Sequence, residues 1–350
     1  MNESSDTVYL LVPGDINTRT GGYRYDKRIM QGLRAMGRHV ELISLEGAYP
    51  FPNAAELEQA GAQLAALPDQ ALTVIDGLAY SVMPEQLARH QNRLRLVALI
   101  HHPLALETGN SRATSEQLMQ SEKAALRYAQ RVITTSQSTA DSLRDYQVPD
   151  SAMVAVCPGT DIAPLARGAS PDSFNLLCVA TLTQRKAHDV LLEAMAQLKE
   201  LPWHLTCAGS LERDADTAQA LLRQCHELDL GERVSFTGEA DEATLNALYQ
   251  QADLFVLASY HEGYGMVLVE AIARGLPIVA SDAGAIPSTI PTGAGILVSP
   301  GNATALAEAL RQFMQDDVLR QSLQNAAKTA RTSLQSWEQS TREFEAALTW

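Results

Sequence analysis

Short apolar runs alternate with stretches of helical periodicity along the first half of the chain. Strands separated by helices indicate a parallel sheet with helices on both faces. Such strands are buried on both sides, which accounts for uninterrupted apolar runs such as LRLVALI. The expected strands are Val8–Val12, Val40–Leu42, Leu72–Ile75, Leu94–Ile100, Val132–Thr135 and Met153–Val156.

The same rhythm restarts in the second half after a break rich in Pro, Gly, Ala and Asp at Cys157–Asp172. This break is typical of a linker between domains. We therefore expect an α/β chain of two Rossmann-like domains, residues 1–165 and 166–334, whose parallel sheets face a central cleft with ligands at the carboxyl ends of the strands. The expected strands are Asn175–Ala180, Trp203–Ala208, Val234–Phe236, Leu254–Ala258 and Ile278–Ser281.

The tail from Ala303 onward is helical in pattern. Its last part places Leu334, Trp337, Thr341, Phe344 and Leu348 on one face at three- and four-residue spacing. Two large aromatic side chains on a modest helix need a docking surface. We expect residues 335–350 to cross back and pack on the first domain, with a dimer contact as the alternative.

Composition narrows the classes of protein. The chain has 350 residues, 46% hydrophobic and 19% charged, with 27 Lys and Arg against 41 Asp and Glu, a net charge of −14. This acidic balance argues against general nucleic-acid binding. A secretory signal and a membrane-spanning run are not expected, so we predict a cytoplasmic location. The four cysteines lack metal-site spacing and are expected to be reduced thiols.

The segment Ser259–Ser281, SYHEGYGMVLVEAIARGLPIVAS, carries the clearest chemistry. A polar loop with glycines follows a strand and enters a helix near Gly265 or Met266, so backbone amides and the helix dipole favour an anion. Glu262 precedes the helix and Glu270 lies inside it, among apolar neighbours. Carboxylates accept hydrogen bonds from vicinal hydroxyls; the alternative is a helix cap at Glu262 and a solvated Glu270.

Two further segments carry cations near a predicted helix start. Arg185 and Lys186 open a helix after the strand that ends at Ala180, where cations oppose the helix dipole and so indicate a bound anion; the alternative is an exposed surface pair. Gly21–Gly22 precede a basic helix and match neither a GxGxxG nor a P-loop pattern. The positive charge suits a phosphorylated donor, an anionic acceptor or a lipid head group; the alternative is a helix face exposed to solvent. The cations, against the single acidic residue Asp26, are Arg19, Arg24, Lys27, Arg28, Arg34 and Arg38.

Polar residues also follow other strands. His101 and His102 end a buried strand in IHHPLALE, although a lone histidine is more often structural, and Glu107 and Thr108 lie nearby. Gly209 and the Thr237-Gly238-Glu239 turn follow strands in the second half, where ordinary turns are the alternative.

The stretch HEGYGMVLVEAIARGLPIVAS resembles the E-x7-E segment of the family 4 retaining glycosyltransferases, which have the GT-B fold. The resemblance implies that Glu262 contacts donor-sugar hydroxyls, that Glu270 binds the ribose, and that amides from Tyr264 to Val267 face the sugar and diphosphate. Lys186 matches the lysine that grips the diphosphate in the family. Thr181 and Ala187 depart from the family's strand-end arginine and following glycine, so we assign the second cation to Arg185.

The resemblance also sets the remaining expectations for the site. The catalytic residues are expected to be His102, Arg185, Lys186 and Glu262. The donor-binding residues are expected to be Gly21, Gly22, Gly209, Gly238, Glu239, Gly263, Tyr264, Gly265, Met266, Val267 and Glu270.

The expected function is sugar transfer, of the hexosyltransferase type, from a nucleotide diphosphate sugar such as a UDP- or GDP-sugar. The resemblance implies retention of configuration and independence of metal, with no cofactor. The acceptor is a sugar, a lipid-linked or a small molecule, and a homodimer and peripheral membrane contact are further expectations. The alternatives are a sugar-nucleotide epimerase or phosphorylase on the same fold, or a non-catalytic nucleotide-sugar binding subunit.

Overall fold

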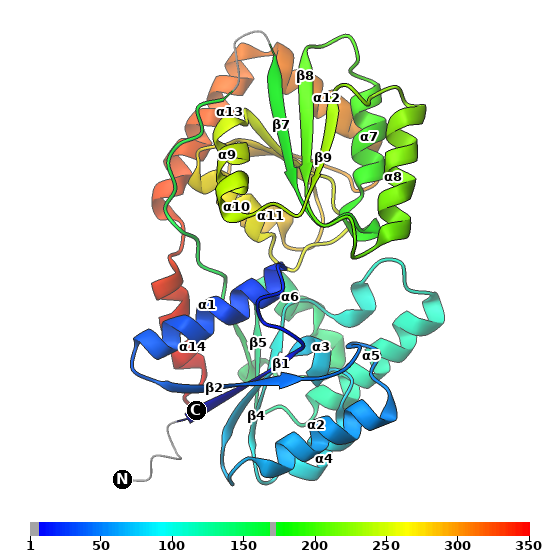
Figure 1. The fold of residues 1–350 in the computed structure, drawn as a ribbon. Helices are drawn as coiled ribbons and strands as arrows, with labels where there is room; N and C mark the ends of the chain where they lie inside the picture. Colours follow the sequence, from blue (N-terminus) through cyan, green and yellow to red (C-terminus); the bar gives the residue numbers. More distant parts are fainter. Residues whose placement is uncertain (1–6, 169–172) are drawn as a thin grey trace. The chain divides into compact units, whose positions relative to one another are not determined.

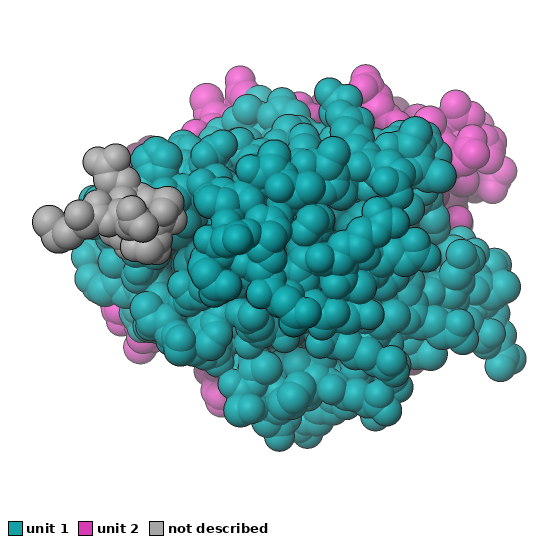
Figure 2. Space-filling model, turned by 90° about the horizontal axis from the view of Figure 1, so that it is seen from below, with its two compact units in different colours: residues 1–159, 335–350 teal, residues 160–334 magenta. Residues whose placement is uncertain are grey.

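The computed structural model describes residues 7–168 and 173–350 and divides into two units. Unit 1 comprises residues 1–159 and 335–350, and unit 2 comprises residues 160–334 (Figure 2). The division falls a few residues before the expected one because the linker is already bonded to unit 2: the Arg331 guanidinium donates to the Ala163 carbonyl, and the Ala166 amide donates to the Arg274 carbonyl at 2.8 Å. The last four residues of the expected linker, 169–172, lie outside the described residues.

Unit 1 is built on a six-stranded parallel sheet in the order β2-β1-β3-β4-β5-β6 (Figure 1). All six strands expected in the first half are present. β3 and β4 are buried almost throughout, as a sheet covered on both faces requires. The strands are β1 (Thr7–Pro13), β2 (His39–Leu45), β3 (Leu72–Asp76), β4 (Arg95–Ile100), β5 (Arg131–Thr134) and β6 (Met153–Ala155).

Helices connect these strands. In α1 the Thr20 side chain accepts a hydrogen bond from the Tyr23 amide and so caps the helix, whose buried face repeats at helical spacing. Two short helices, α3 and α4, were not expected; Asp76 caps α3 by accepting from the Leu78 amide at 2.8 Å. The helices are α1 (Gly21–Ala35), α2 (Ala54–Ala66), α3 (Gly77–Tyr80), α4 (Pro84–His90), α5 (Arg112–Leu126) and α6 (Gln137–Ser142).

Unit 2 repeats the architecture with the strand order β12-β11-β10-β7-β8-β9, again parallel. The edge strand β12 was not expected, because GILV is short and only partly buried. The strands are β7 (Phe174–Val179), β8 (Trp203–Ala208), β9 (Val234–Gly238), β10 (Leu254–Leu257), β11 (Ile278–Ser281) and β12 (Gly295–Val298). The helices are α7 (His188–Ala196), α8 (Ala215–Glu227), α9 (Glu242–Gln251), α10 (Met266–Ala273), α11 (Ile286–Thr289), α12 (Ala303–Gln315) and α13 (Asp317–Ala330).

Each sheet has a point where the strand order reverses. In unit 1 it lies between β1 and β3, and in unit 2 between β10 and β7. Loops that follow adjacent strands diverge at such a point and leave room for a ligand beyond the carboxyl ends. The topology therefore marks the loops after β7 and β10 in unit 2, and those after β1 and β3 in unit 1.

The C-terminal helix α14 (Trp337–Ala347) packs against α1 within unit 1, as expected (Figure 1). Gly32 allows the close approach, because a Cβ there would collide with the Thr341 side chain. The Arg28 guanidinium lies 4.9 Å from the centre of the Trp337 ring. The tail is not one continuous helix: a break precedes Trp337, and Leu334 packs on the core of unit 2 instead of sharing the face of α14.

Two expectations from composition can be compared with the structure. Cys178, Cys207 and Cys225 are buried, Cys157 is half-buried, and all four are free thiols. Among residues 7–168 and 173–350, none of the helices combines the length and the apolar character that crossing a bilayer requires.

Candidate functional site

The loops after β7 and β10 bring two cations and one carboxylate together in unit 2. Lys186 Nζ lies 2.5 Å from Glu262 Oε1, and Arg185 Nη1 lies 3.6 Å from Glu262 Oε2. Arg185 and Lys186 belong to a 3₁₀ turn, η5 (Gln184–Lys186), that precedes α7. The anion that this cation pair indicated is therefore at least in part the Glu262 side chain.

Burial makes this cluster electrostatically strong. Glu262 is 6% exposed. Burial alone would raise the pKa of Glu262, but the Lys186 ammonium and the Arg185 guanidinium, with hydrogen bonds from Lys186 and Ser259, lower it to about 2. Burial lowers the pKa of Lys186, and Glu262 opposes that change. The cluster thus holds an ionised carboxylate at neutral pH.

Backbone and hydroxyl contacts fix the loop that carries Glu262. The Ser259 hydroxyl donates to Glu262 Oε1 at 2.7 Å, and the Ala285 amide donates to the Glu262 carbonyl at 2.8 Å. Gly284 adopts a φ of 56°, and a Cβ there would collide with the Glu262 carbonyl. The SDAGA turn at residues 281–285 therefore supports this loop. Ser259 and Gly284 were missed because their role depends on contacts between separate loops.

The loop after β7, which carries Arg185, is hydrogen-bonded to the loop after β10, which carries Glu262. The Tyr260 amide donates to the Arg185 carbonyl at 2.8 Å, and Arg185 Nη1 donates to the His261 carbonyl at 2.8 Å. Ala187, where the family has glycine, adopts the left-handed conformation at a φ of 49°. Such a φ is costly for a residue with a Cβ, which gives a physical reason for glycine at this position.

The helix α10 begins at the glycine-bearing loop, as expected. Its N-cap is Gly265, with a φ of 85° and without a capping side chain. The alternative in which Glu262 caps α10 is therefore not what the structure shows. Residues Gly263, Tyr264, Met266 and Val267 surround this helix start.

Glu270, one turn inside α10, is buried instead of solvated, 7% exposed. The Tyr249 hydroxyl donates to Glu270 Oε2 at 3.1 Å. Arg274 donates to the Glu270 carbonyl at 2.9 Å and stacks on the Tyr249 ring at 4.3 Å. These contacts orient the carboxylate that the sequence singled out.

Three more predicted residues follow the strands beyond β7. Gly209 comes directly after β8, and a Cβ there would collide with the Ala180 carbonyl after β7. The Gly209 amide donates to the Gly238 carbonyl at 3.0 Å, and Gly238 ends β9 with a φ of 71°. Glu239 follows. The structure therefore places them at the same end of the sheet as the cation–carboxylate cluster.

Unit 1 contains a second buried cluster, which was not predicted. His101 Nε2 lies 3.0 Å from Asp26 Oδ1 and 3.2 Å from Asp76 Oδ2. Asp76 ends β3, His101 follows β4, and Asp26 lies in α1. A Cβ on Gly22 would lie 3.2 Å from the His101 ring, so Gly22 lets α1 approach the imidazole. Gly21 starts the same helix.

The two aspartates control the charge of this imidazole. Burial would lower the pKa of His101, but Asp26 and Asp76 raise it to about 10. Burial raises the pKa of Asp26 to about 6 against the effect of His101. The two aspartates therefore favour the protonated imidazolium form of His101.

His102 lies in the same loop with different partners. Its Nε2 is 3.0 Å from Glu107 Oε2, and its Nδ1 is 3.1 Å from the Pro103 carbonyl. Two adjacent histidines thus have distinct environments, one held by buried aspartates and the other by a half-exposed glutamate.

Asp26, Asp76 and His101 are also a group of side chains that could bind a metal ion. Their ligand atoms all lie within 4.8 Å of one another. Both carboxylates already contact one imidazole nitrogen, so a metal would have to replace the proton that they share with it. We assign no metal to this group.

The basic residues in α1 and just after it are largely used within unit 1. Arg34 donates to the Val40 carbonyl at 2.7 Å, and Arg38 pairs with Glu345 of α14 at 3.4 Å. Lys27 donates to Asn17 at 2.8 Å, and Arg28 stacks on Trp337. Docking of the C-terminal helix therefore accounts for part of the charge that suggested an anionic ligand or a membrane.

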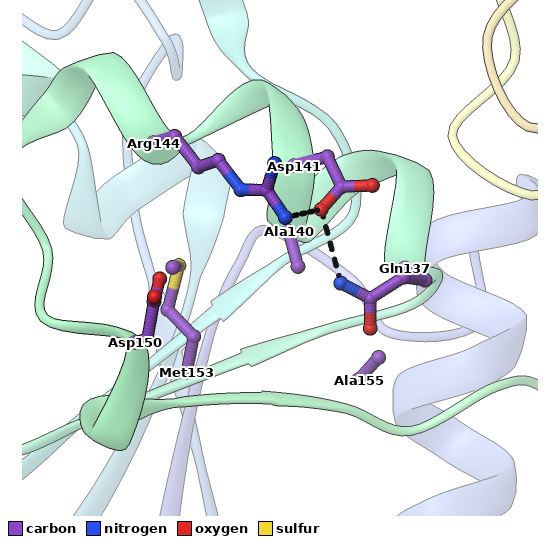
Figure 3. Close-up of a pocket in the computed structure, with 7 residues that line it drawn as sticks. All are labelled: Gln137, Ala140, Asp141, Arg144, Asp150, Met153 and Ala155. Atoms are coloured by element: carbon purple, nitrogen blue, oxygen red, sulfur yellow. Dashed lines mark hydrogen bonds and ion pairs between the residues drawn. The ribbon is translucent and has the colours of Figure 1, made fainter.

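A pocket at the edge of unit 1, beside α6 and β6, lies apart from the predicted residues (Figure 3). Asp141 pairs with Arg144 at 2.8 Å and accepts from Gln137 at 3.1 Å, so the charges of Asp141 and Arg144 neutralise each other. It contains none of the residues that the sequence singled out. The pocket is lined by Gln137, Ala140, Asp141, Arg144, Asp150, Met153 and Ala155.

Two parallel α/β units, each with polar loops at its strand reversal, are the architecture of the GT-B fold. Residues 20–163 match the family model Glycosyltransferase Family 4, and residues 166–330 match the model Glycosyl transferases group 1. The chain belongs to the family 4 glycosyltransferases.

Individual relatives agree with this assignment. The D-inositol 3-phosphate glycosyltransferase of Corynebacterium diphtheriae is 28% identical over 214 residues, which are 56% of this chain and 50% of the relative. Its counterpart in Corynebacterium aurimucosum is 32% identical over 217 residues, 56% of this chain and 51% of the relative. The chain therefore spans about half the length of the curated relatives it matches.

Solved structures show the same fold over the whole chain. Sucrose-phosphate synthase from Thermosynechococcus elongatus aligns with a TM-score of 0.82 at 24% identity and covers 97% of this chain and 98% of its own. HepE from Anabaena, in complex with UDP and glucose, aligns with a TM-score of 0.76 at 18% identity and covers 97% and 99%.

Proposed function

We propose that the protein transfers a sugar from a nucleotide diphosphate sugar to an acceptor hydroxyl, with the donor bound by unit 2 and the acceptor by unit 1. The observation that carries the proposal is the cluster of Lys186, Arg185 and Glu262 at the strand reversal of unit 2. Its two cations and the N-terminus of α10 in the adjoining loop suit a diphosphate.

Each buried carboxylate has a distinct role in this proposal. Glu262 orients hydroxyls of the donor sugar while it holds Lys186 and Arg185. Glu270, fixed by Tyr249, accepts hydrogen bonds from the ribose. The amides of Gly263 to Val267, together with those of Gly209 and Gly238, complete the donor pocket. The HepE structure with UDP and glucose supports a nucleotide and a sugar as ligands of this fold.

The chemistry that we propose is stabilisation of the leaving group. As the sugar–diphosphate bond breaks, negative charge grows on the diphosphate oxygens, and the Lys186 and Arg185 cations with the helix amides stabilise it. These groups do the work of a metal, so we propose transfer that needs no metal and no cofactor. The acceptor attacks from the face that the leaving group vacates, a diphosphate oxygen takes its proton, and the configuration is retained.

On the acceptor side we propose one of the two histidines after β4. His102 is the residue that the sequence favoured. His101 is supported by its position directly after β4 and by the two aspartates that favour its protonated form, in which it can donate a hydrogen bond to substrate. Replacing each histidine by Gln in turn and comparing acceptor KM and kcat separates the two.

The first experiment is a thermal-shift screen against nucleotides and nucleotide sugars, because a ligand that binds only the folded state raises Tm. The selected donor is then incubated with a panel of sugar, lipid-linked and small-molecule acceptors. Release of nucleoside diphosphate that depends on an acceptor supports transfer. Conversion of the donor without acceptor indicates an epimerase, and binding without release indicates a non-catalytic subunit. The cytoplasmic location, homodimer and membrane contact stay predictions.

A further inference from the structure

Glu122 of α5 is a fully buried carboxylate outside every residue set named so far. The Ser81 hydroxyl donates to Glu122 Oε1 at 2.6 Å, and the Leu104 amide donates to Glu122 Oε2 at 3.2 Å. One side chain therefore holds two loops that leave different strands of the sheet.

Those two loops carry the His101–Asp76 pair. Asp76 ends β3 and caps α3, and Ser81 follows the last turn of that helix. His101 ends the run of β4, and Leu104 begins the 3₁₀ turn η2 (Leu104–Leu106) three residues later. Glu122 thus bonds to Ser81, beyond the α3 turn that Asp76 caps, and to Leu104, in the loop after His101. Asp76 Oδ2 and His101 Nε2 are 3.2 Å apart. The neighbouring Ser121 hydroxyl donates to the Ser81 carbonyl at 2.8 Å and reinforces the contact.

The buried Glu122 carboxyl group depends on the neutral hydrogen-bond donors around it. Its hydrogen-bond partners are the Ser81 hydroxyl and the Leu104 amide, both neutral donors. Burial raises the pKa of Glu122 to about 7 against the effect of these donors. A buried carboxyl group without a cation is tolerated only where its hydrogen bonds are satisfied.

We propose that Glu122 is a positioning residue for the acceptor side of the reaction: it fixes the α3 turn and the loop that carries His101 and His102 relative to each other, and so sets the alignment of His101 against Asp76. The proposal rests on the proposed function for its catalytic consequence. Its structural consequence, the alignment of His101, is independent of that function.

The test compares Glu122→Ala with Glu122→Gln. Glutamine can accept from the Leu104 amide through Oε1 and donate to the Ser81 hydroxyl through Nε2, whereas alanine makes neither bond. A misplacement on the ångström scale can cost about a hundredfold in rate, so we expect kcat/KM for the acceptor to fall at least about tenfold in Glu122→Ala and to be largely restored in Glu122→Gln. The donor affinity stays at the wild-type value in both. Glu116→Ala, an exposed carboxylate on the same helix, is the matched control.

A second readout does not need turnover. Histidine labelled with ¹⁵N, with His101→Gln to assign the signal, gives the His101 pKa by NMR. We expect this pKa to fall by about one unit or more in Glu122→Ala as Asp76 and His101 separate, and to stay near the wild-type value in Glu122→Gln and Glu116→Ala. If Glu122→Ala does not fold, Ser81→Ala removes the 2.6 Å bond alone and is expected to give a smaller change in the same direction.

The outcomes separate the two proposals. If the folded Glu122→Ala and Ser81→Ala variants keep the wild-type His101 pKa, the positioning role is wrong, whatever the activity. If the pKa falls but no acceptor yields turnover with the wild type, the alignment holds and the proposed function fails. If the pKa falls while acceptor kcat/KM is unchanged, Glu122 does not position the reaction.

Discussion

Removing the Lys186 ammonium tests the electrostatics of the cluster in unit 2. Lys186→Met keeps most of the apolar stem and deletes the charge 2.5 Å from Glu262. The pKa of Glu262, lowered from 4.5 to about 2, corresponds to about 3 kcal/mol of stabilisation of the ionised form. Lys186 is the largest of the groups that lower it, so we expect a loss of about 2 kcal/mol in the free energy of unfolding at pH 7.

The pH dependence of that loss follows from the sign of the change. A carboxyl group whose pKa is lower in the folded state contributes stability above its ordinary pKa of 4.5, and that contribution disappears as the pH falls through about 2. The destabilisation by Lys186→Met is therefore full at pH 7 and shrinks below pH 4.5.

Urea unfolding of a double-mutant cycle measures the interaction. The cycle comprises the wild type, Lys186→Met, Glu262→Gln and the double variant, and we expect a coupling energy of about 2 kcal/mol. Lys199→Met is the matched control, because Lys199 lies 3.8 Å from the exposed Asp229 and such surface pairs contribute at most about 1 kcal/mol. Single effects that add to within about 0.5 kcal/mol in the double variant would refute the buried pair.

Three further predictions concern other parts of the molecule. Gly32→Ala places a Cβ against Thr341 and should destabilise unit 1 by about 2 kcal/mol and speed proteolysis of the C-terminal helix. Gly231→Ala is the control, because Gly231 has open space around it, and should have neither effect. Equal rates of proteolysis in the two variants would contradict the packing of α14 on α1. Because its pKa is raised, His101 stabilises unit 1 fully below about pH 6.5 and loses that effect as the pH rises through 10. His101→Gln should therefore flatten the dependence of the unfolding free energy on pH between pH 7 and 10. An unchanged slope argues against the ion pairs. Turnover measured with EDTA should equal turnover without it, and a chelator-dependent loss would count against metal-independent transfer.

Much of the fold was predictable from local pattern. Runs such as LRLVALI can be buried on both sides only in a covered parallel sheet, and all six expected strands of unit 1 form. The aromatic face of the last helix, with Trp337 and Phe344, correctly predicted a docking partner. The strand β12 was not predicted because a segment of four partly buried residues shows little hydrophobic periodicity.

The candidate site was predictable only where it depends on one segment at a time. Arg185, Lys186, Glu262 and Glu270 stand out by their position after a strand or inside an apolar helix. Their pairing is a contact between separate loops, which sequence order does not show.

The acceptor side shows this limit more strongly. Asp26 was hidden among the cations of α1, and nothing local distinguishes His101 from His102. The difference between the two histidines comes from Asp26 and Asp76, which lie on other elements of the sheet and helix layers. Glu122 was likewise invisible, because its partners Ser81 and Leu104 reach it from two different loops.

The central claim, that unit 2 binds the diphosphate of a nucleotide sugar through Lys186, is tested most directly by calorimetry. The nucleoside diphosphate selected in the thermal-shift screen and its monophosphate are titrated into the wild type, Lys186→Met and Lys199→Met. We expect Lys186→Met to weaken the diphosphate by about tenfold or more, as loss of a charge-assisted hydrogen bond predicts, and the monophosphate much less, while Lys199→Met changes neither. Equal Kd values for the diphosphate in the wild type and Lys186→Met would contradict the claim.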